Sequence, residues 1–196
     1  MPLRSVRAVY DDTTITVYQA YRSEIALKAL EHQTFVSPFK VSRMTWIKPS
    51  FLWMMYRSGC AQKEGQENIL AIKISREGFE WALDHACLSH YENTIYNSHE
   101  EWTVIKDQSP VRVQWDPERD IHLKPLNYRS IQIGLSSVAV EKYVNDWIID
   151  IKDITPICKK MSTLIESKSF EDLKSLLPVE RPYLLPSHIA KRIGAT

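Results

Sequence analysis

A dense run of apolar side chains, residues 43–59 with the sequence RMTWIKPSFLWMMYRSG, constrains this chain more than any other segment. Pro49 favours an extended conformation in the residue before it and is itself suited to the first turn of a helix. The residues that follow are apolar on almost every side of a helix, which Gly59 would end. The sequence therefore predicts a deeply buried helix from near Pro49, with Leu52 and Met55 almost inaccessible to solvent.

Short strand-like and helix-like segments alternate along the rest of the chain. Alternating β-branched residues predict strands, and apolar residues three or four apart predict helices. Ser23, Ser75 and Ser136 or Ser137 are suited to cap helices. Strands are expected at residues 13–22, 44–47, 69–74, 111–115, 128–135 and 148–155, and helices at 24–33, 76–91, 138–148 and, as two short pieces, 156–178.

The length of 196 residues suits one domain with a full core and is marginal for two. The order of the expected elements indicates an α+β domain with a helical C-terminal extension. Residues 1–177 are expected to form the core domain with its C-terminal helices. Residues 178–196, which include Pro182 and Pro186, are expected to form an extended C-terminal arm.

Composition excludes several classes of protein. The net charge of +1 is low for a protein dedicated to duplex nucleic acid, and the five glycines are too scattered for a phosphate-binding glycine loop. No segment approaches the roughly 18 apolar residues of a membrane span, and the N-terminus lacks the apolar run of a signal peptide. Three widely separated cysteines suit a reducing compartment, so we expect a cytoplasmic protein without a membrane partner.

Metal binding and nucleophilic catalysis have weak signals. His85, Cys87 and His90 are close in sequence, but on a helix His85 and Cys87 would point about 200° apart and could not share an ion. Cys60 follows Gly59 at a predicted helix C-terminus, where the helix dipole disfavours a thiolate. The sequence therefore predicts no metal site and no cysteine nucleophile.

The predicted helix after Pro49 carries one mixed face. Ser50, Trp53 and Arg57 are spaced three and four apart, which places a hydroxyl, an indole and a guanidinium together. Helix N-termini attract anions, aromatic rings stack on bases, and Arg binds phosphate with two hydrogen bonds. The alternative is structural: Trp53 belongs to the core and Arg57 pairs with a surface acid.

A second group of polar residues surrounds an expected turn at Asp116 and Pro117. The functional interpretation places Gln114 or Glu118 at a strand end that faces a pocket, with Gln132 on the neighbouring strand. The alternative is a solvated turn that is rich in charge. We expect this segment to lie beside the same cleft as residues 43–50.

Several long motifs carry a family resemblance. The segments VYDDTTITVYQAY, RMTWIKPSFLWMMYRSG, FEWAL, SPVRVQWDPERD and YRSIQIGL resemble the domain of unknown function 4291 family, over about residues 7–186. A second resemblance is topological: the strand and helix within residues 15–36 look like the opening of ADP-ribosyltransferase-like proteins. That resemblance implies a split, mostly antiparallel sheet flanked by helices. Gln19 departs from it, because the superfamily has His or Arg after the tyrosine.

The resemblance to ADP-ribosyltransferases implies a nucleotide-recognising protein, acting on NAD or on a nucleotide end of RNA. NAD would then be its cofactor or substrate. The implied roles are ligand contact by Tyr18 and Gln19, orientation of a ribose hydroxyl by Glu118 or Gln132, ring stacking by Trp46 or Trp53, and phosphate binding by Arg43, Lys48 and Arg57, with Ser50 beside them. Gln19, Glu118 and Gln132 are the candidate catalytic residues.

A binding module without catalysis is the competing hypothesis. The same aromatic residues would then stack on single-stranded nucleic acid or contact a protein partner. The shape of the surface separates the alternatives: a deep pocket favours a nucleotide binder, a shallow basic groove favours nucleic acid, and a flat apolar patch favours a protein. A hydrolase is the third alternative and has no nucleophile signal. The sequence does not indicate an oligomeric state.

Overall fold

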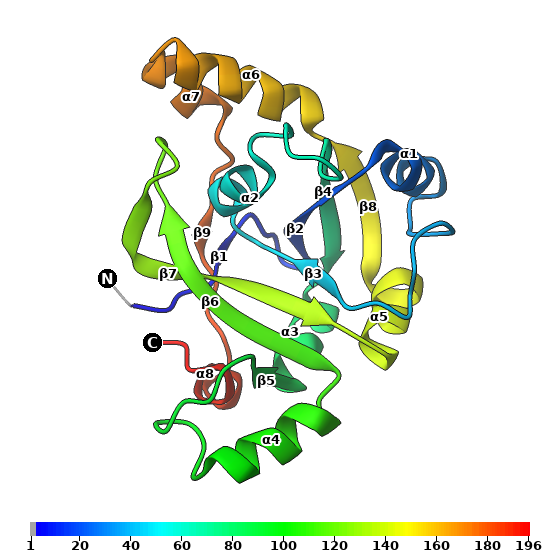
Figure 1. Cartoon of the computed structure of the whole chain (residues 1–196), viewed down its shortest axis with the longest axis vertical. Coiled ribbons are helices and arrows are strands. Elements are labelled where there is room, and N and C mark those ends of the chain that lie inside the picture. Colours follow the sequence, from blue (N-terminus) through cyan, green and yellow to red (C-terminus); the bar gives the residue numbers. More distant parts are fainter. Residues whose placement is uncertain (1–2) are drawn as a thin grey trace.

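A three-stranded antiparallel sheet forms one half of the protein, for which a computed structural model describes residues 3–196 (Figure 1). Strand β2 (Thr14–Tyr21) pairs along its whole length with β4 (Asn68–Ser75), and β4 pairs with β8 (Ile148–Asp153). Alternate residues of β2 and β4 are fully buried, such as Ile15 and Val17 of β2 and Ile72 and Ile74 of β4, as the β-branched alternation predicts.

A four-stranded sheet forms the other half, in the order β3-β7-β6-β5. The long hairpin of β6 (Val111–Arg119) and β7 (Pro125–Leu135) is its centre, with β3 (Thr45–Ile47) antiparallel at one edge and β5 (Ala86–Leu88) parallel at the other. The two sheets meet where the Tyr18 backbone N–H donates to the Lys48 carbonyl at 2.7 Å. The expectation of a split, mostly antiparallel sheet is confirmed.

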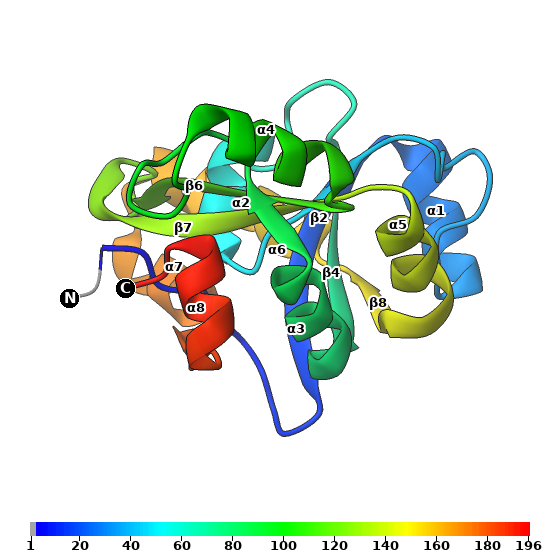
Figure 2. The same cartoon turned by 90° about the horizontal axis from the view of Figure 1, so that it is seen from below.

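The helices cover these sheets and divide the core into a large and a small cluster. Helices α3 and α8 lie side by side against the β6–β7 side of the protein (Figure 2), whereas α6 and α7 lie at the opposite end from α4 (Figure 1). The helices are α1 (Ser23–His32), α2 (Phe51–Ser58), α3 (Arg76–Asp84), α4 (His99–Gln108), α5 (Val138–Lys142), the π-helix η1 (Tyr143–Trp147), α6 (Thr155–Glu166), α7 (Phe170–Leu176) and α8 (Ser187–Ile193).

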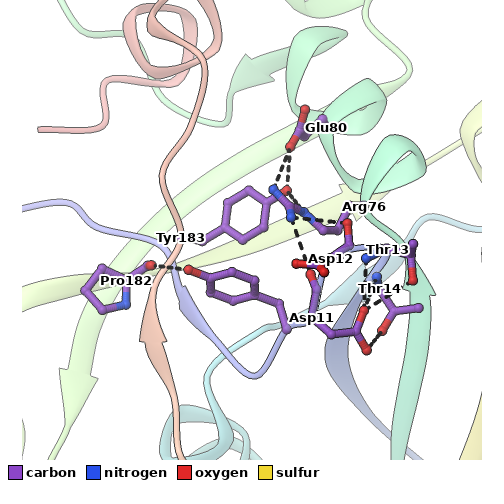
Figure 3. Close-up of polar contacts among 9 residues, drawn as sticks. Asp11, Asp12, Thr13, Thr14, Arg76, Glu80, Pro182 and Tyr183 are labelled. Atoms are coloured by element: carbon purple, nitrogen blue, oxygen red, sulfur yellow. Dashed lines mark hydrogen bonds and ion pairs between the residues drawn. The ribbon is translucent and has the colours of Figure 1, made fainter.

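The C-terminal segment returns to the N-terminal segment and packs against it. Strand β1 (Arg7–Ala8) pairs with β9 (Arg181–Pro182), and the Arg76 guanidinium lies against the rings of Tyr10 and Tyr183, at 5.6 and 4.9 Å from their centroids. Figure 3 shows that Arg76 also reaches toward the turn before β2 and toward α3 itself. These contacts join three segments that are far apart in sequence.

Several predicted elements differ from the structure. The helix expected at residues 76–91 ends at Asp84, because residues 86–88 form the buried parallel strand β5. His85 and Cys87 are therefore not on one helix, and the angular argument made for them does not hold. Residues 178–196 are not wholly extended, because α8 forms there and buries Ile189 and Ile193.

The turn expected at Asp116 and Pro117 is also wrong. Strand β6 continues through both residues, with an irregularity in its pairing after Pro117. The chain turns later, where the Asp120 carboxylate accepts from the backbone N–H groups of His122 and Lys124, both at 2.8 Å. A local Asp-Pro signal was overridden by pairing with β7.

Helix α2 ends as predicted, with Gly59 in the left-handed conformation, but it begins at Phe51 with Ser50 as its N-cap, so Pro49 precedes the helix and is not in its first turn. Met55 is fully buried, but Leu52 is only half-buried, since it lies at the margin of the small core cluster. Together the two sheets and their helices form a single α+β domain.

Candidate functional site

A cavity of about 570 Å³ opens at the seam between the two sheets. That volume lies in the range of small-molecule sites. Its walls come from β2, the start of α1, the loop between α1 and β3, β3 itself, α2 and the turn after α2. The lining residues are Gln19, Ala20, Tyr21, Arg22, Glu24, Ile25, Pro38, Phe39, Lys40, Arg43, Met44, Thr45, Trp46, Lys48, Met54, Arg57, Gly65 and Gln66.

The cavity is strongly cationic. Arg22 forms an ion pair with Glu24 at 3.2 Å, and Glu24 is the one carboxylate of the lining. Within residues 3–196, no ion pair involves Lys40, Arg43, Lys48 or Arg57, which also line it. Unpaired cations that converge on a cavity favour a ligand with negative charge.

Lys48 is the buried cation of this group, with 7% of its surface exposed. Its backbone is fixed between β2 and α2, so its side chain extends from the end of β3 into the cavity wall. Burial, then the charge of Arg57, lowers the pKa of Lys48 to about 7, and Asp116 acts in the opposite direction. The ammonium group is therefore held in a position that is costly without an anion.

Gln19 holds the cavity wall together. Its amide nitrogen donates to Thr45 Oγ1 at 2.7 Å and to Tyr21 Oη at 2.9 Å, and lies 3.2 Å from the Trp46 carbonyl oxygen. Its amide oxygen accepts from Tyr143 Oη at 2.7 Å. The amide of Gln19 thus ties β2, β3 and the π-helix together, and its two N–H groups already have partners in the protein.

Trp46 presents an aromatic surface to the cavity. It lies opposite Gly134 on β7, and a Cβ atom at Gly134 would be only 2.9 Å from Trp46 Cζ2 and 2.8 Å from Met44 Sδ. The absence of a side chain at Gly134 therefore lets the indole lie close against the sheet. Trp46 remains half-buried, so part of its ring is available to a ligand.

Trp53 and Tyr18, predicted as ligand contacts, do not line the cavity. Trp53 is 5% exposed, and its ring packs against Lys48, with Lys48 Nζ 5.5 Å from the ring centroid. Tyr18 packs edge-on against Phe51 in the small core cluster. The structural interpretation of Trp53 is confirmed, because the buried face of α2 includes it.

Ser50 and Glu118 belong to a separate buried polar cluster at the N-terminus of α2. Ser50 Oγ accepts from the Trp53 N–H at 3.2 Å and donates to Glu118 Oε1 at 2.8 Å. Glu180 Oε1 accepts from the Phe51 N–H at 2.7 Å. Ser50 thus joins residues 43–50 to residues 114–120, but β7 lies between β3 and β6 and none of residues 114–120 lines the cavity. The predicted anion site at this helix end is wrong, because the protein's own carboxylates fill it.

The carboxyl groups of this cluster have raised pKa values. Burial raises the pKa of Glu118, against the effect of hydrogen bonds from Arg119, Ser50 and Ser130. Burial, and then the charge of Glu118, raises the pKa of Glu180 to about 8. Glu118 therefore serves the junction of α2 with β6 and does not line the cavity.

Gln132 also lies outside the cavity lining. Its amide donates to the Asp116 carboxylate, which accepts from Gln114 as well, at 2.9 Å. These three residues are neighbours on the paired strands β6 and β7. Of the predicted site residues, the structure brings Gln19, Arg43, Trp46, Lys48 and Arg57 together in the cavity and leaves Tyr18, Ser50, Trp53, Glu118 and Gln132 outside it.

Some cavity residues were missed from the sequence. Lys40 and Phe39 lie in the loop before β3, three and four residues before Arg43, so the basic and aromatic character of that loop was the available signal. Thr45 and Tyr21 contribute through their hydrogen bonds to Gln19. Nothing local in the sequence indicates those contacts, since they join separate elements.

Metal sites and membrane-spanning helices are both absent from residues 3–196. No group of three or more His, Cys, Asp or Glu side chains in this range could hold a metal ion. None of the helices there is long and apolar enough to cross a membrane.

Comparison with protein families gives one match. The model described as Domain of unknown function (DUF4291) matches residues 5–183, which include all the residues that line the cavity. No curated protein matches the chain. Because the match covers well over half of the 196 residues, the chain belongs to the family described as Domain of unknown function (DUF4291).

Proposed function

We propose that the cavity at the seam of the two sheets binds a nucleotide or an NAD-like molecule through its phosphate groups. The convergence of Lys40, Arg43, Lys48 and Arg57 without ion-pair partners carries this proposal. Arg43 and Arg57 are exposed enough to reach a ligand, whereas Lys48 is fixed deeper in the wall. A group of guanidinium and ammonium side chains suits phosphate best, because guanidinium binds it with two hydrogen bonds and ammonium supplies a compact positive charge.

The apolar part of the lining supports a base or another flat ring. Trp46 and Phe39 are both half-buried and belong to different walls of the cavity. Stacking on an aromatic side chain contributes about 1–3 kcal/mol per base. A diphosphate between Arg43 and Arg57 and a ring against Trp46 would use both properties of the site, within the available volume of about 570 Å³.

We propose that the cavity binds a nucleotide or an NAD-like molecule, without transfer of an ADP-ribosyl group. The split of the two sheets supports a likeness to ADP-ribosyltransferases, but Glu118 and Gln132, the residues expected to orient a ribose, lie outside the cavity lining. Gln19 is engaged in the wall through both ends of its amide. These positions support recognition of a nucleotide more than catalysis on one.

The test is a thermal-shift and calorimetric series with the full chain against ADP, NAD, ADP-ribose and a short single-stranded RNA. A ligand that binds the native state raises the melting temperature. We expect the phosphate-bearing small molecules to do so and to bind in competition with one another. A stabilising effect of the RNA alone would favour the nucleic-acid alternative, and no effect of any ligand would contradict the proposal.

Repeating the ligand series with Arg57→Ala tests whether the ligands bind in this cavity. Arg57 is exposed on α2 and forms no ion pair within the described residues, so its loss should leave the melting temperature of the free protein nearly unchanged. We expect nucleotide binding to weaken by about 1.5–3 kcal/mol, the range for hydrogen bonds to charged groups, or about 10- to 150-fold. Lys159→Ala, at an exposed position on α6, is the matched control and should leave affinity unchanged.

A further inference from the structure

Lys48 differs from every other lysine in the described chain. It is the one lysine among the buried residues, yet it lines the cavity, and the other lysines are exposed or half-buried. Its amino group has one hydrogen bond in the protein, to the Trp46 carbonyl oxygen at 3.2 Å. The Trp53 ring lies 5.5 Å from it and supplies an apolar wall.

The charges around Lys48 favour a neutral amine. Arg57 on α2 lies close enough to disfavour the ammonium form, and Asp116 on β6 opposes that effect less strongly than burial and Arg57 combined. Asp116 is itself engaged by the amides of Gln114 and Gln132. A desolvated lysine beside another cation is the arrangement that makes an amine nucleophilic near neutral pH.

We infer that Lys48 is a nucleophile that forms an imine with the aldehyde of a phosphorylated ligand in this cavity. Arg43 and Arg57, which line the same cavity, would bind the phosphate and place the carbonyl carbon at Lys48 Nζ. This goes beyond the proposed nucleotide binding, because it assigns a covalent step. ADP-ribose is both a nucleotide and a phosphorylated aldehyde, because its terminal ribose can open to an aldehyde.

The step balances without an oxidant or a reductant. The Nζ lone pair forms a bond to the carbonyl carbon, and the electrons of the C=O π bond move to oxygen. A proton moves from nitrogen to that oxygen and gives a carbinolamine. Protonation of the hydroxyl releases water as the C=N bond forms, and the second nitrogen proton is lost to solvent when the neutral imine results.

The experiment is reductive trapping on the full chain. The protein is incubated with pyridoxal 5′-phosphate, reduced with sodium borohydride and mapped by mass spectrometry of its peptides. We expect Lys48 to be labelled at least tenfold faster than half-buried Lys73 or exposed Lys159, and pyridoxal without its phosphate to label it more slowly. Inorganic phosphate should protect Lys48 alone. Labelling of the other lysines with Lys48 unmodified would overturn the inference.

The pH profile separates a nucleophile from a lysine that is merely accessible. For the wild type, we expect the trapping rate at Lys48 to reach half its maximum near pH 7. Arg57→Ala should move the Lys48 profile to higher pH, because one of the charges that disfavour the ammonium form is gone. A profile for Lys48 that coincides with that of Lys159 would contradict the inference, and this measurement needs no substitution at Lys48.

Lys48→Arg gives a second, independent check. Arg keeps the positive charge but cannot form the imine, so labelling at position 48 must disappear while the control Lys159→Arg leaves it unchanged. The two proposals fail separately. If ADP stabilises the protein but Lys48 is not trapped, imine formation is contradicted and nucleotide binding stands. If Lys48 is trapped but no nucleotide stabilises the protein, nucleotide binding is contradicted and imine formation stands.

Discussion

At the scale of single residues, Lys48 is a buried amino group with few partners in the protein. Lys48 has one hydrogen bond and no ion pair within the described residues. Its folded-state pKa of about 7 lies below the ordinary value of 10.5. The folded state therefore binds fewer protons than the unfolded state between these pH values, and the contribution of Lys48 to stability rises with pH across that window.

Lys48→Met should therefore stabilise the free protein at pH 6. The methionine fills a similar volume without the cost of a buried charge, and we expect the free energy of unfolding to increase by about 1–4 kcal/mol. The gain should shrink as the pH rises toward 9.5, where the lysine is neutral in the folded state. Urea unfolding of both proteins at pH 6 and pH 9.5 measures this. A variant less stable than the wild type at pH 6 would show that the ammonium group supports the fold.

At the scale of elements, the N-terminus of α2 depends on a carboxyl group from the C-terminal segment. Glu180 accepts from the Phe51 N–H, and Arg7 donates to the Glu180 carbonyl oxygen at 3.1 Å. Glu118, Arg7, Tyr18 and Tyr128 are the titratable or charged side chains that interact electrostatically with it. Because its pKa is raised from 4.5 to about 8, the folded state binds more protons than the unfolded state between these values, and stability falls as pH rises through them.

Glu180→Gln should remove much of this pH dependence. The amide oxygen can still accept from the Phe51 N–H, but it carries no charge beside Glu118. We expect nearly unchanged stability at pH 4.5 and a gain of more than about 1 kcal/mol at pH 9, since each pKa unit corresponds to about 1.4 kcal/mol. Urea midpoints across this pH range provide the measurement. Equal pH dependence in the two proteins would mean that Glu180 titrates normally.

The contact between α3 and the π-helix depends on a glycine. A Cβ atom at Gly78 would lie 2.3 Å from Trp147 Cγ, which is closer than packed atoms allow. Gly78→Ala gains up to about 1 kcal/mol of helix propensity, but overpacking costs about 1–3 kcal/mol. We expect the steric cost to dominate and the free energy of unfolding to fall, as measured by chemical denaturation. A more stable variant would show that Trp147 moves aside freely.

At the scale of the whole molecule, the C-terminal segment is part of the main core. Tyr183 is 4% exposed and packs against Phe79 and Tyr10. It also lies against the Arg76 guanidinium (Figure 3). Beyond it, the Ile193 carbonyl oxygen accepts from Trp115 Nε1 at 2.7 Å. The chain therefore closes on its own beginning and fixes β1, α3 and β6 relative to one another.

Tyr183→Ala should lower the free energy of unfolding by about 3–5 kcal/mol, the range for removing a large buried aromatic side chain. The neighbouring Leu184 is 86% exposed, so Leu184→Ala is the matched control and should change stability by less than about 0.5 kcal/mol. Denaturant unfolding of the two variants tests this difference. Similar, small effects would indicate that the C-terminal segment is only loosely attached.

Local sequence determined the elements whose signals are short-range. Ser75 caps α3, Gly59 ends α2, and the alternating residues within 13–22 form β2, whereas Ser23, which was expected to cap a helix, lies inside α1. The sequence also identified Arg43, Trp46, Lys48 and Arg57 as one group, because all four belong to one continuous segment, residues 43–59, in which an extended stretch leads into a short helix. Helix caps and strand alternation depend on neighbours along the chain, so they can be predicted without the fold.

Only the tertiary structure decided the rest. Residues 86–88 became a strand because β6 offered a partner, and Asp116–Pro117 stayed extended because β7 did. Glu118 was drawn to the end of α2 and away from the cavity by Ser50, and Gln19 was engaged by Tyr143 from the far side of the chain. Pairing, burial and hydrogen-bond satisfaction join residues distant in sequence, and a buried polar group binds whichever partner the fold brings to it.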